Sequence, residues 1–449
     1  MSKIVTRFPP SPTGYLHIGG ARTALFNYLF AAHGGGEMRV RFEDTDKARG
    51  KKEYEEDIVE GLRWLGLIEK PDIWKQSERT DIYRTHIKKL IDSGHAYEAE
   101  AATDDTGKKV VRFKNPNVDT VFSDLVRGEV RFNTGDLKDF VIAKSVDEPL
   151  YHLTVVVDDE EMAVTHVIRG EDHISNTPRQ ILILEALGCK RPIYAHIPLI
   201  LAPDRTKLSK RHGAVSVNEY RRNGYLPQAL LNYLALLGWN PGGEQELYDL
   251  EGLVASFSLE HVQKSGAVFD IEKLKWFNRE YLKKLMPKEY ETLFVEYIQT
   301  VPKAAVPPYL PKAIGIIQER AETFEQAFEL LHTDCSFLED STNYGAPFPT
   351  PLLTQGAKAD ASTVVEHLAA IMKMLEGIEE KGFTAANVKE MVFPYATEVG
   401  RSAVLWPLRV ALSGKEKSPD PFIMSEYLGK AMTLQRINSA LQRLRGEHV

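Results

Sequence analysis

The chain opens with strand and helix patterns in alternation, and this order constrains its fold more than any other feature of the sequence. Residues 3–8 have the composition of a short strand, and residues 21–29 repeat apolar side chains at helical spacing up to the glycines at 34–36. Residues 38–42 alternate apolar and charged side chains, and residues 54–65 form an amphipathic helical pattern. Strands that alternate with helices build parallel sheets, so we expect an α/β fold with a Rossmann-like parallel-sheet domain.

The alternation is interrupted once and then resumes. Short strand patterns separated by polar turns, at residues 110–113, 130–132 and 140–143, predict an α+β insertion. The patterns that follow predict strands at residues 155–157, 162–168 and 194–201 and a helix at residues 181–187. Beyond these the chain reads as helical. The predicted segments are the two halves of the sheet domain at 1–80 and 151–213, the insertion at 81–150, and helical domains at 214–305 and 306–449.

Composition limits the compartment and the class of partner. Two cysteines, Cys189 and Cys335, lie far apart and can form neither a disulfide framework nor a cysteine-rich zinc site, so we expect a cytoplasmic protein. The N-terminus lacks the apolar segment of a signal peptide, and the longest apolar stretch, residues 229–239, is far shorter than the ~20 residues that span a bilayer. We therefore expect no membrane partner. The formal net charge of −7 does not decide about nucleic acid, because phosphate is attracted by local basic patches.

Residues 10–20 join the first strand to the first helix and form the first candidate site. In open parallel sheets ligands bind at the carboxyl ends of strands, and a helix N-terminus presents free N–H groups that suit phosphate. Gly14, Gly19 and Gly20 would let a ligand approach the backbone, and His17 can donate a hydrogen bond to a phosphate oxygen. An ordinary turn with a surface histidine is the alternative, and this segment alone leaves both interpretations open.

A basic loop after the last predicted strand is the second candidate site. Its centre consists of Lys207, Leu208, Ser209, Lys210 and Arg211. Several positive side chains on a loop can bind a polyphosphate as negative charge develops. Taken alone, the segment is better explained as a solvated surface loop.

The two candidate sites point to a family only when they are considered together. The sequence has no GxxxxGK[ST] P-loop, no HExxH motif and no dinucleotide-binding glycine pattern. A histidine–glycine turn after the first strand and a lysine-rich loop after the last one resemble class I aminoacyl-tRNA synthetases. Residues 17–20 are similar to the HIGH motif of that family, with Gly20 in place of the final histidine, and residues 207–211 are similar to its KMSKS motif.

The resemblance implies that ATP binds with Mg²⁺ between these two segments. The ATP-binding residues would be Gly14, His17, Gly19, Gly20, Lys207, Leu208, Ser209, Lys210 and Arg211. Among them, His17, Lys207 and Lys210 would act in catalysis.

Further blocks over nearly the whole chain resemble the bacterial-type glutamyl enzymes of the family. They are residues 7–14, 41–46, 151–153 with 156–159, 167–172 and 411–415. Glutamate carries two carboxylates and one ammonium group, so a selective pocket needs cations and an anion. Arg7, Glu43 and Arg169 fall at predicted strand ends and should therefore share one crevice.

The resemblance assigns a role to each residue of this glutamate pocket. Arg7 and Arg169 would bind substrate carboxylates, and Glu43 would hold the amine. Ser11 and Tyr151 would line the pocket. The alternative for Arg169 is an ion pair with one of the acidic residues that follow it at positions 171 and 172.

The implied reaction is the attachment of L-glutamate to tRNA(Glu) through a glutamyl-adenylate, with release of diphosphate and AMP. The resemblance also implies that tRNA binds before glutamate is activated. Residues 81–150 would then bind the acceptor end, 214–305 would contact the stem, and 306–449 would bind the anticodon. We expect the protein to be a monomer.

The insertion departs from the pattern of some bacterial relatives, which carry cysteine and histidine ligands for a structural zinc ion there. Residues 94–130 contain no cysteine and a single histidine, His95. We therefore expect the protein to purify without stoichiometric zinc. An acidic stretch at residues 98–105 occupies that place instead.

Several rival functions share part of this pattern. A glutaminyl enzyme continues with β-barrels, whereas residues 310–449 read as helical, and the short paralogue that glutamylates a modified tRNA base has no anticodon domain. A nucleotidylyltransferase of similar fold needs neither residues 207–211 nor a long helical tail. A non-catalytic RNA-binding relative should have lost His17 or Lys210, and both are present. Whether tRNA(Gln) is charged as well stays open.

Overall fold

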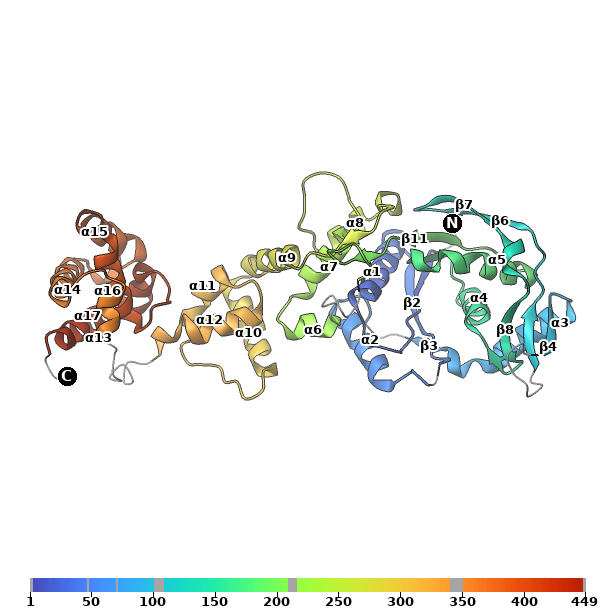
Figure 1. The fold of residues 1–449 in the computed structure, drawn as a ribbon, viewed down its shortest axis with the longest axis horizontal. Helices are drawn as coiled ribbons and strands as arrows, with labels where there is room; N and C mark the ends of the chain where they lie inside the picture. Colours follow the sequence, from blue (N-terminus) through green and yellow to red (C-terminus); the bar gives the residue numbers. More distant parts are fainter. Residues whose placement is uncertain are drawn as a thin grey trace. The chain divides into compact units, whose positions relative to one another are not determined.

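Two compact units make up the chain, and the boundary between them lies inside a helix. In this computed structural model the described residues are 3–46, 48–69, 72–100, 109–208, 216–339 and 350–446. The units are Met1–Tyr281, which holds the strands, and Leu282–Val449, which is helical (Figure 1). The α/β class and the helical C-terminal region that the sequence predicts are confirmed.

A parallel sheet begins the first unit. Its strands β1 (Val5–Phe8), β2 (Glu37–Phe42) and β3 (Ile73–Lys75) lie in that order, and α1 (Ile18–His33) and α2 (Lys52–Trp64) form the connections. Apolar side chains on one stripe of α1, among them Leu25 and Leu29, are fully buried against the sheet and the later helices. The predicted strand–helix–strand–helix order is therefore confirmed.

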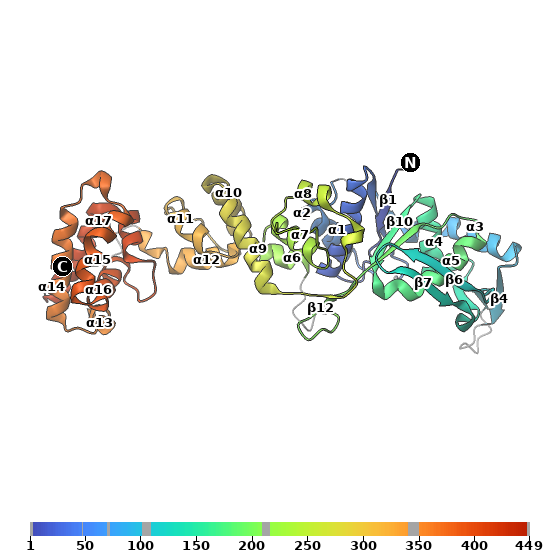
Figure 2. The same ribbon diagram turned by 90° about the horizontal axis from the view of Figure 1, so that it is seen from above.

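The second half of the parallel arrangement lies beside β1. Strands β10 (His166–Gly170) and β11 (Ile193–Ile197) are parallel, and α5 (Thr177–Ala186) connects them. Thr165, just before β10, donates its N–H to the carbonyl of Val5 at 2.9 Å, and its hydroxyl accepts from the Val5 N–H at 2.9 Å. Figure 2 shows β1 and β10 side by side. The carboxyl ends of β1, β2 and β10 consequently open on the same edge.

The insertion contains an antiparallel sheet and a separate hairpin. The sheet has the order β4 (Ala96–Glu100), β5 (Lys109–Phe113), β8 (Phe140–Ser145) and β9 (Glu148–Pro149), and it packs with α3 (Thr80–Asp92). The hairpin of β6 (Asp119–Asp124) and β7 (Gly128–Asn133) instead joins β11 of the parallel half, where Asp124 is paired with Tyr194. Part of the insertion thus extends the sheet that carries the site.

Three of the predicted strands differ from the structure. Residues 155–157 were expected to form a strand but lie in helix α4 (Tyr151–Glu161). Every residue from 153 to 159 in that helix is buried, so no polar face reveals a helical period, and the three valines resemble a strand. The strand expected at 162–168 begins at His166, after a turn, and the one expected at 194–201 is broken by Pro198.

Short elements and helices complete the first unit. They are β12 (Ile200–Leu201), β13 (Ala267–Val268), α6 (Val217–Arg222), α7 (Pro227–Leu236), α8 (Leu250–Ser256) and α9 (Ile271–Lys284), which crosses the boundary. Helices α7 and α8 pack on α1. In the described part of the chain, no helix is both long enough and apolar enough to cross a bilayer.

The second unit consists of helices. They are α10 (Pro287–Thr300), α11 (Leu310–Arg320), α12 (Phe324–Thr333), α13 (Thr350–Gln355), α14 (Ala361–Glu376), α15 (Ala385–Val399), α16 (Arg401–Ser413) and α17 (Pro421–Leu444). Gly429 interrupts α17 with a φ of 77°, a conformation that glycine adopts without strain. Lys415, after α16, donates to the carbonyl of Thr333 at 2.8 Å and so ties the end of α12 to the last helices.

Candidate active site

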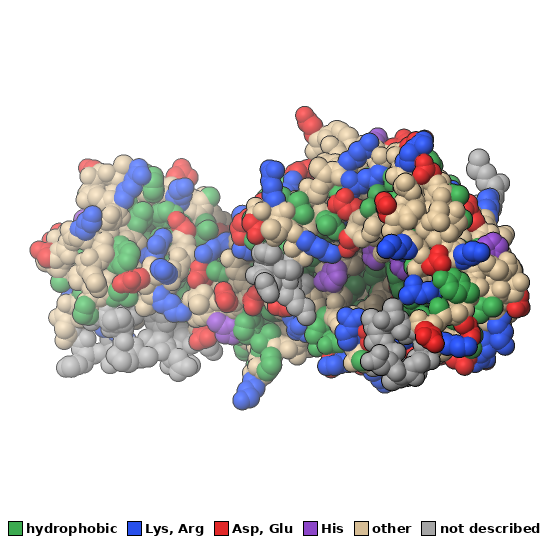
Figure 3. Space-filling model, turned by 45° about the vertical axis from the view of Figure 1, so that its right-hand side comes forward, with side chains coloured by type: hydrophobic (Ala, Val, Ile, Leu, Met, Phe, Trp, Pro, Cys, Tyr) green, Lys and Arg blue, Asp and Glu red, His purple; other side chains and the backbone are tan. Residues whose placement is uncertain are grey.

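A single cavity brings together most of the residues that the sequence singles out. It has a volume of about 1050 Å³ and lies at the carboxyl ends of β1, β2 and β10. The predicted site residues that line it are Arg7, Ser11, Gly14, His17, Gly19, Gly20, Glu43, Tyr151, Arg169, Lys207 and Leu208. Ser209, Lys210 and Arg211 lie outside the described residues. The larger unit is hollowed on the face shown in Figure 3, with Lys and Arg side chains around the hollow.

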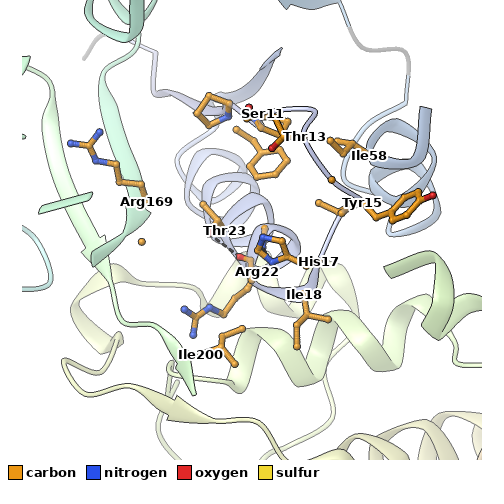
Figure 4. Close-up of a pocket in the computed structure, with 18 of the residues that line it drawn as sticks. Ser11, Thr13, Tyr15, His17, Ile18, Arg22, Thr23, Ile58, Arg169 and Ile200 are labelled. Atoms are coloured by element: carbon orange, nitrogen blue, oxygen red, sulfur yellow. Dashed lines mark hydrogen bonds between the residues drawn. The ribbon is translucent and has the colours of Figure 1, made fainter. Parts of the chain in front are cut away.

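His17 begins helix α1 and caps it. Its Nδ1 accepts a hydrogen bond from the N–H of Gly20 at 3.1 Å, so a neutral ring carries its proton on Nε2. A Cβ on Gly19 would lie 3.1 Å from the ring of His17, and one on Gly20 would lie 3.3 Å from the Leu16 side chain. The glycines therefore leave room for the capping ring and for Leu16, while Gly14 has open space around it. In Figure 4, Ser11 and Thr13 lie on one side of His17, and Arg169 comes from β10 across the cavity.

The described ends of the basic loop line the same cavity as His17. Leu208 donates its N–H to the carbonyl of Ile200 at 3.0 Å, and Lys207 forms an ion pair with Asp172 at 2.7 Å. After residues 209–215, Ser216 is bridged to His17, and the N–H of Val217 donates to the carbonyl of Leu16 at 2.8 Å. The two candidate sites, nearly 200 positions apart in the sequence, therefore meet at one cavity.

Arg7, which lines the cavity, shares a buried carboxylate with Arg41, which does not. Asp159, on α4, accepts from Nε of Arg7 at 3.2 Å and from Nη1 of Arg41 at 2.8 Å. Burial alone would raise the pKa of Asp159, but the two guanidinium groups hold it below its ordinary value. Asp159 therefore stays ionised and fixes both arginines in place. Asp159 belongs to the block at residues 156–159 that resembles the family, but the sequence alone assigns it no role, because Arg7 and Arg41 are far away in the chain.

Glu43 follows β2 and lies between polar neighbours. Nη2 of Arg41 donates to its carboxylate at 3.2 Å, and the Ser11 hydroxyl donates to its main-chain carbonyl at 3.1 Å. Burial raises the pKa of Glu43 above its ordinary value, although Arg41 and Arg7 act in the opposite direction. A cation that entered the cavity would favour the ionised form of this carboxyl group.

Arg169 is held without a carboxylate partner among the described residues. Its Nε donates to Nε2 of His196 at 3.2 Å and its Nη2 donates to the Thr177 hydroxyl at 2.7 Å, whereas its buried Nη1 has no partner. Burial lowers the pKa of Arg169. The alternative of a pair with a following acidic residue does not hold. Glu171 pairs with Arg127 at 2.5 Å, and the residue after it pairs with the basic loop.

Tyr151 begins α4 and faces a neutral histidine. Its hydroxyl lies 3.1 Å from Nδ1 of His173. Burial lowers the pKa of His173 to about 4, so the ring is neutral near pH 7. His173 also lines the cavity. No pattern in the sequence singles it out, although it directly follows the block at residues 167–172.

His, Cys, Asp and Glu side chains are the usual protein ligands of metal ions. Within the ranges that the structure describes, no three His, Cys, Asp or Glu side chains form a group able to hold a metal ion. Both cysteines are free thiols, Cys189 half-buried and Cys335 buried.

Comparison with known proteins assigns the chain to a family. The family model described as class I tRNA synthetases (E and Q), catalytic domain, matches residues 3–106 and 98–276, and an anticodon-binding domain matches residues 271–441. The chain belongs to this class I synthetase family.

Individual relatives match the chain over nearly its whole length. It is 40% identical to the glutamate--tRNA ligase of Aquifex aeolicus, with 99% of this chain and 100% of the relative covered. It is 39% identical to the glutamate--tRNA ligase of Desulforamulus reducens, with 98% and 100% covered. A crystal structure of a glutamate tRNA ligase from Elizabethkingia meningosepticum, in complex with its amino acid, superposes with a TM-score of 0.84 at 30% identity and covers 99% of this chain and 100% of that one.

Proposed function

We propose that this protein attaches L-glutamate to tRNA(Glu) through a glutamyl-adenylate, consuming ATP and releasing diphosphate and AMP. The observation that carries the proposal is the buried Nη1 of Arg169, which has no hydrogen-bond partner among the described residues, in the same cavity as His17 and Lys207. A buried cation that lacks an anion is costly unless a ligand supplies one. The glutamate–tRNA ligases among the relatives point to the same amino acid.

The reaction needs positioning and charge stabilisation rather than a covalent enzyme intermediate. The α-carboxylate of glutamate attacks the α-phosphorus of ATP in line, and diphosphate leaves. A terminal ribose hydroxyl of the tRNA then attacks the carbonyl of the mixed anhydride, and AMP leaves. Mg²⁺ bound to the phosphates would neutralise part of their charge.

Each end of the cavity has its own part in this scheme. Arg7 and Arg169 bind the substrate carboxylates, and Glu43 accepts the ammonium group, in a pocket that Ser11 and Tyr151 also line. The glycine turn, led by Gly14, Gly19 and Gly20, and the N-terminal end of α1 with His17 receive phosphate groups. The lysines of the basic loop, Lys207 and Lys210, meet the charge that develops as diphosphate leaves.

The remaining segments are proposed to bind the tRNA. Residues 81–150 contact the acceptor end, 214–305 the stem, and 306–449 the anticodon. The anticodon-binding match over residues 271–441 supports the last of these. We further propose that the protein works as a cytoplasmic monomer without zinc, in line with its free cysteines.

Replacing Arg169 tests the glutamate pocket. Arg169→Ala should lower kcat/KM for glutamate by roughly ten- to several-thousandfold, equivalent to about 2–5 kcal/mol for a broken buried charge pair. The KM for ATP should change little, and the preference for glutamate over glutamine should shrink. Steady-state charging of tRNA(Glu), run beside a thermal melt, measures all three quantities.

The matched control is Arg63→Ala, which removes an exposed arginine in the last turn of α2, outside the cavity lining and outside the segments proposed to bind tRNA. It should leave glutamate kinetics unchanged. A folded Arg169→Ala variant with the wild-type preference for glutamate over glutamine would contradict the assignment of Arg169. Charging assays with tRNA(Glu) and tRNA(Gln) side by side establish whether the second tRNA is also a substrate.

A further inference from the structure

A buried hydrogen-bonded row lies behind Arg169 and ends at a carboxylate. The Nε of Arg169 donates to Nε2 of His196 at 3.2 Å, and Nδ1 of His196 lies 2.6 Å from Oδ2 of Asp124. All three side chains are buried, and His196 and Asp124 have no exposed side-chain surface. The row therefore connects the cavity to the β6–β7 hairpin of the insertion.

The donors in this row fix the protonation of the histidine. A guanidinium has only donors, so Nε2 of His196 must accept from Arg169, and the ring proton must lie on Nδ1, facing Asp124. Burial lowers the pKa of His196, with Asp124 acting in the opposite direction, which agrees with a neutral ring. Asp124 stays ionised, because its pKa lies below the ordinary value: burial alone would raise it, but the bonds from His196 and Arg127 outweigh that effect.

Thr177, at the start of α5, adds a second support. Its hydroxyl accepts from Nη2 of Arg169 at 2.7 Å and lies 3.0 Å from Nε2 of His196. Nε and Nη2 form one edge of the planar guanidinium, so His196 and Thr177 together occupy that edge. Nη1 is the nitrogen that remains without a partner among the described residues.

The hairpin that supplies Asp124 is itself fixed. Oδ1 of Asp124 accepts from the N–H groups of Val126 at 2.9 Å and Arg127 at 2.8 Å, in the turn between β6 and β7. Arg127 in turn donates to the carbonyl of His196 at 3.2 Å. The position of the row is therefore set by backbone contacts as well as by its side chains.

The two arginines of the glutamate pocket differ in one respect. Arg7 contacts the carboxylate of Asp159 directly, so part of its charge is already neutralised within the protein. Arg169 contacts a neutral imidazole and a hydroxyl, and the nearest carboxylate of its row, Asp124, is separated from it by the His196 ring. Arg169 is thus held in position without direct contact to a carboxylate among the described residues, and its buried charge would be stabilised by an anionic ligand.

We propose that Asp124, His196 and Thr177 are positioning residues that present Nη1 of Arg169 to the substrate carboxylate and so make the pocket select a carboxylate over a carboxamide. This rests on the proposed role of Arg169 in glutamate binding. The Arg169 guanidinium is held by neutral partners, so the substrate carboxylate would be its only anion. When glutamine replaces glutamate, this charge pair is lost, and the loss of binding free energy is large because the site is buried.

Paired substitutions separate positioning from packing. Thr177→Val keeps the shape of the side chain but removes the acceptor for Nη2, and Thr177→Ser restores the hydroxyl. His196→Phe keeps a ring beside Phe122 and Tyr194 but removes the acceptor for Nε, and His196→Gln restores an acceptor. The Thr177 pair carries the test if His196→Phe does not fold.

The expected result is a change confined to the amino acid. Thr177→Val and His196→Phe should raise the KM for glutamate by roughly ten- to a hundredfold, the range found at metal sites when a hydrogen bond that orients a ligating residue is removed. The KM for ATP should stay within about twofold of wild type, and the glutamate-to-glutamine preference should fall. Thr177→Ser and His196→Gln should recover most of the loss.

A double-mutant cycle with Arg169→Ala completes the experiment. If Thr177 acts through Arg169, then Thr177→Val should add almost nothing in the Arg169→Ala background. Additive losses, equal changes in the KM for glutamate and ATP, or no recovery with serine would overturn the positioning proposal. An Arg169→Ala variant with unchanged glutamate kinetics would instead overturn the pocket assignment, and the positioning proposal with it.

Discussion

The charged side chains at the two ends of the cavity differ in their exposure to solvent. At the end proposed to bind glutamate, Arg7, Arg41 and Arg169 have relative exposures of 1%, 0% and 5%, and each is held by other buried groups. At the end proposed to bind the nucleotide, the Lys207 side chain is 63% exposed and pairs with an Asp172 side chain that is 39% exposed.

This difference fits the two tasks of such an enzyme. Buried and fixed charges interact strongly with a ligand, because little solvent screens them, and they penalise a ligand of the wrong charge. Exposed charges on a loop contribute little to stability but can follow a phosphate group as its charge changes during the reaction. Selection of the amino acid and activation by ATP are therefore expected to respond differently to substitution.

The largest effect on stability is expected from Asp159, the carboxylate shared by two arginines at the glutamate end. Asp159→Asn should lower the free energy of unfolding at pH 7 by about 3–5 kcal/mol, because it leaves Arg7 and Arg41 buried with less compensation. It should also weaken glutamate binding. Denaturant unfolding and glutamate kinetics measure the two effects.

The pH dependence of the same variant follows from the depressed pKa of Asp159. The stability that an ionised Asp159 provides is fully present above its unfolded pKa of about 3.9, and it is lost as the pH falls through the lower folded value. The gap in stability between wild type and Asp159→Asn should therefore narrow in acid. Asp147→Asn, which removes an exposed carboxylate paired with Arg84, is the control and should cost less than about 1 kcal/mol. If Asp159→Asn lowered the free energy of unfolding as little as Asp147→Asn does, the proposed contrast between buried and exposed charges would be wrong.

The next largest effect is expected at the nucleotide end, and in rate rather than in stability. Lys210→Ala should slow glutamate activation, measured as pyrophosphate exchange with tRNA present, by roughly ten- to a thousandfold, the scale for one lost transition-state contact. Its melting temperature should barely move, because a contact made only in the transition state adds nothing to the stability of the free protein. Lys190→Ala, at an exposed position after α5 and outside the segments proposed to bind tRNA, is the matched control. Normal exchange in Lys210→Ala would remove this lysine from the mechanism.

The smallest effect is expected at His17, where capping and substrate binding can be told apart. His17→Ala removes the acceptor for the N–H of Gly20 and should cost about 0.5–2 kcal/mol of stability, the range for a lost helix cap. His17→Asn keeps a capping oxygen and should recover that stability. If the imidazole contacts phosphate, both variants should lose activation, whereas full activity in His17→Asn would reduce the role of His17 to capping.

Much of the site could be anticipated from the sequence, because its signals are local. The glycine turn after β1 and the basic loop after β12 are short segments with a distinct composition, and eleven of the predicted residues line the cavity. Arg7, Glu43 and Arg169 could be placed because residues near the ends of parallel strands share one edge. Helix α4 was mistaken for a strand because it is buried on all sides and shows no period.

The sequence by itself determined the alternation of strands and helices, the two motif segments and the charge types of the pocket, since each depends on spacing over a few residues. Only the tertiary structure decided which groups compensate one another. Asp159 lies 152 positions from Arg7 along the chain. Asp124 lies 72 positions from His196, and its strand β6 is the neighbour of β11 in the sheet although the two are far apart in the chain. Such pairs form because packed strands bring distant segments within hydrogen-bonding distance. A local pattern of side chains does not specify which distant residue will be the partner.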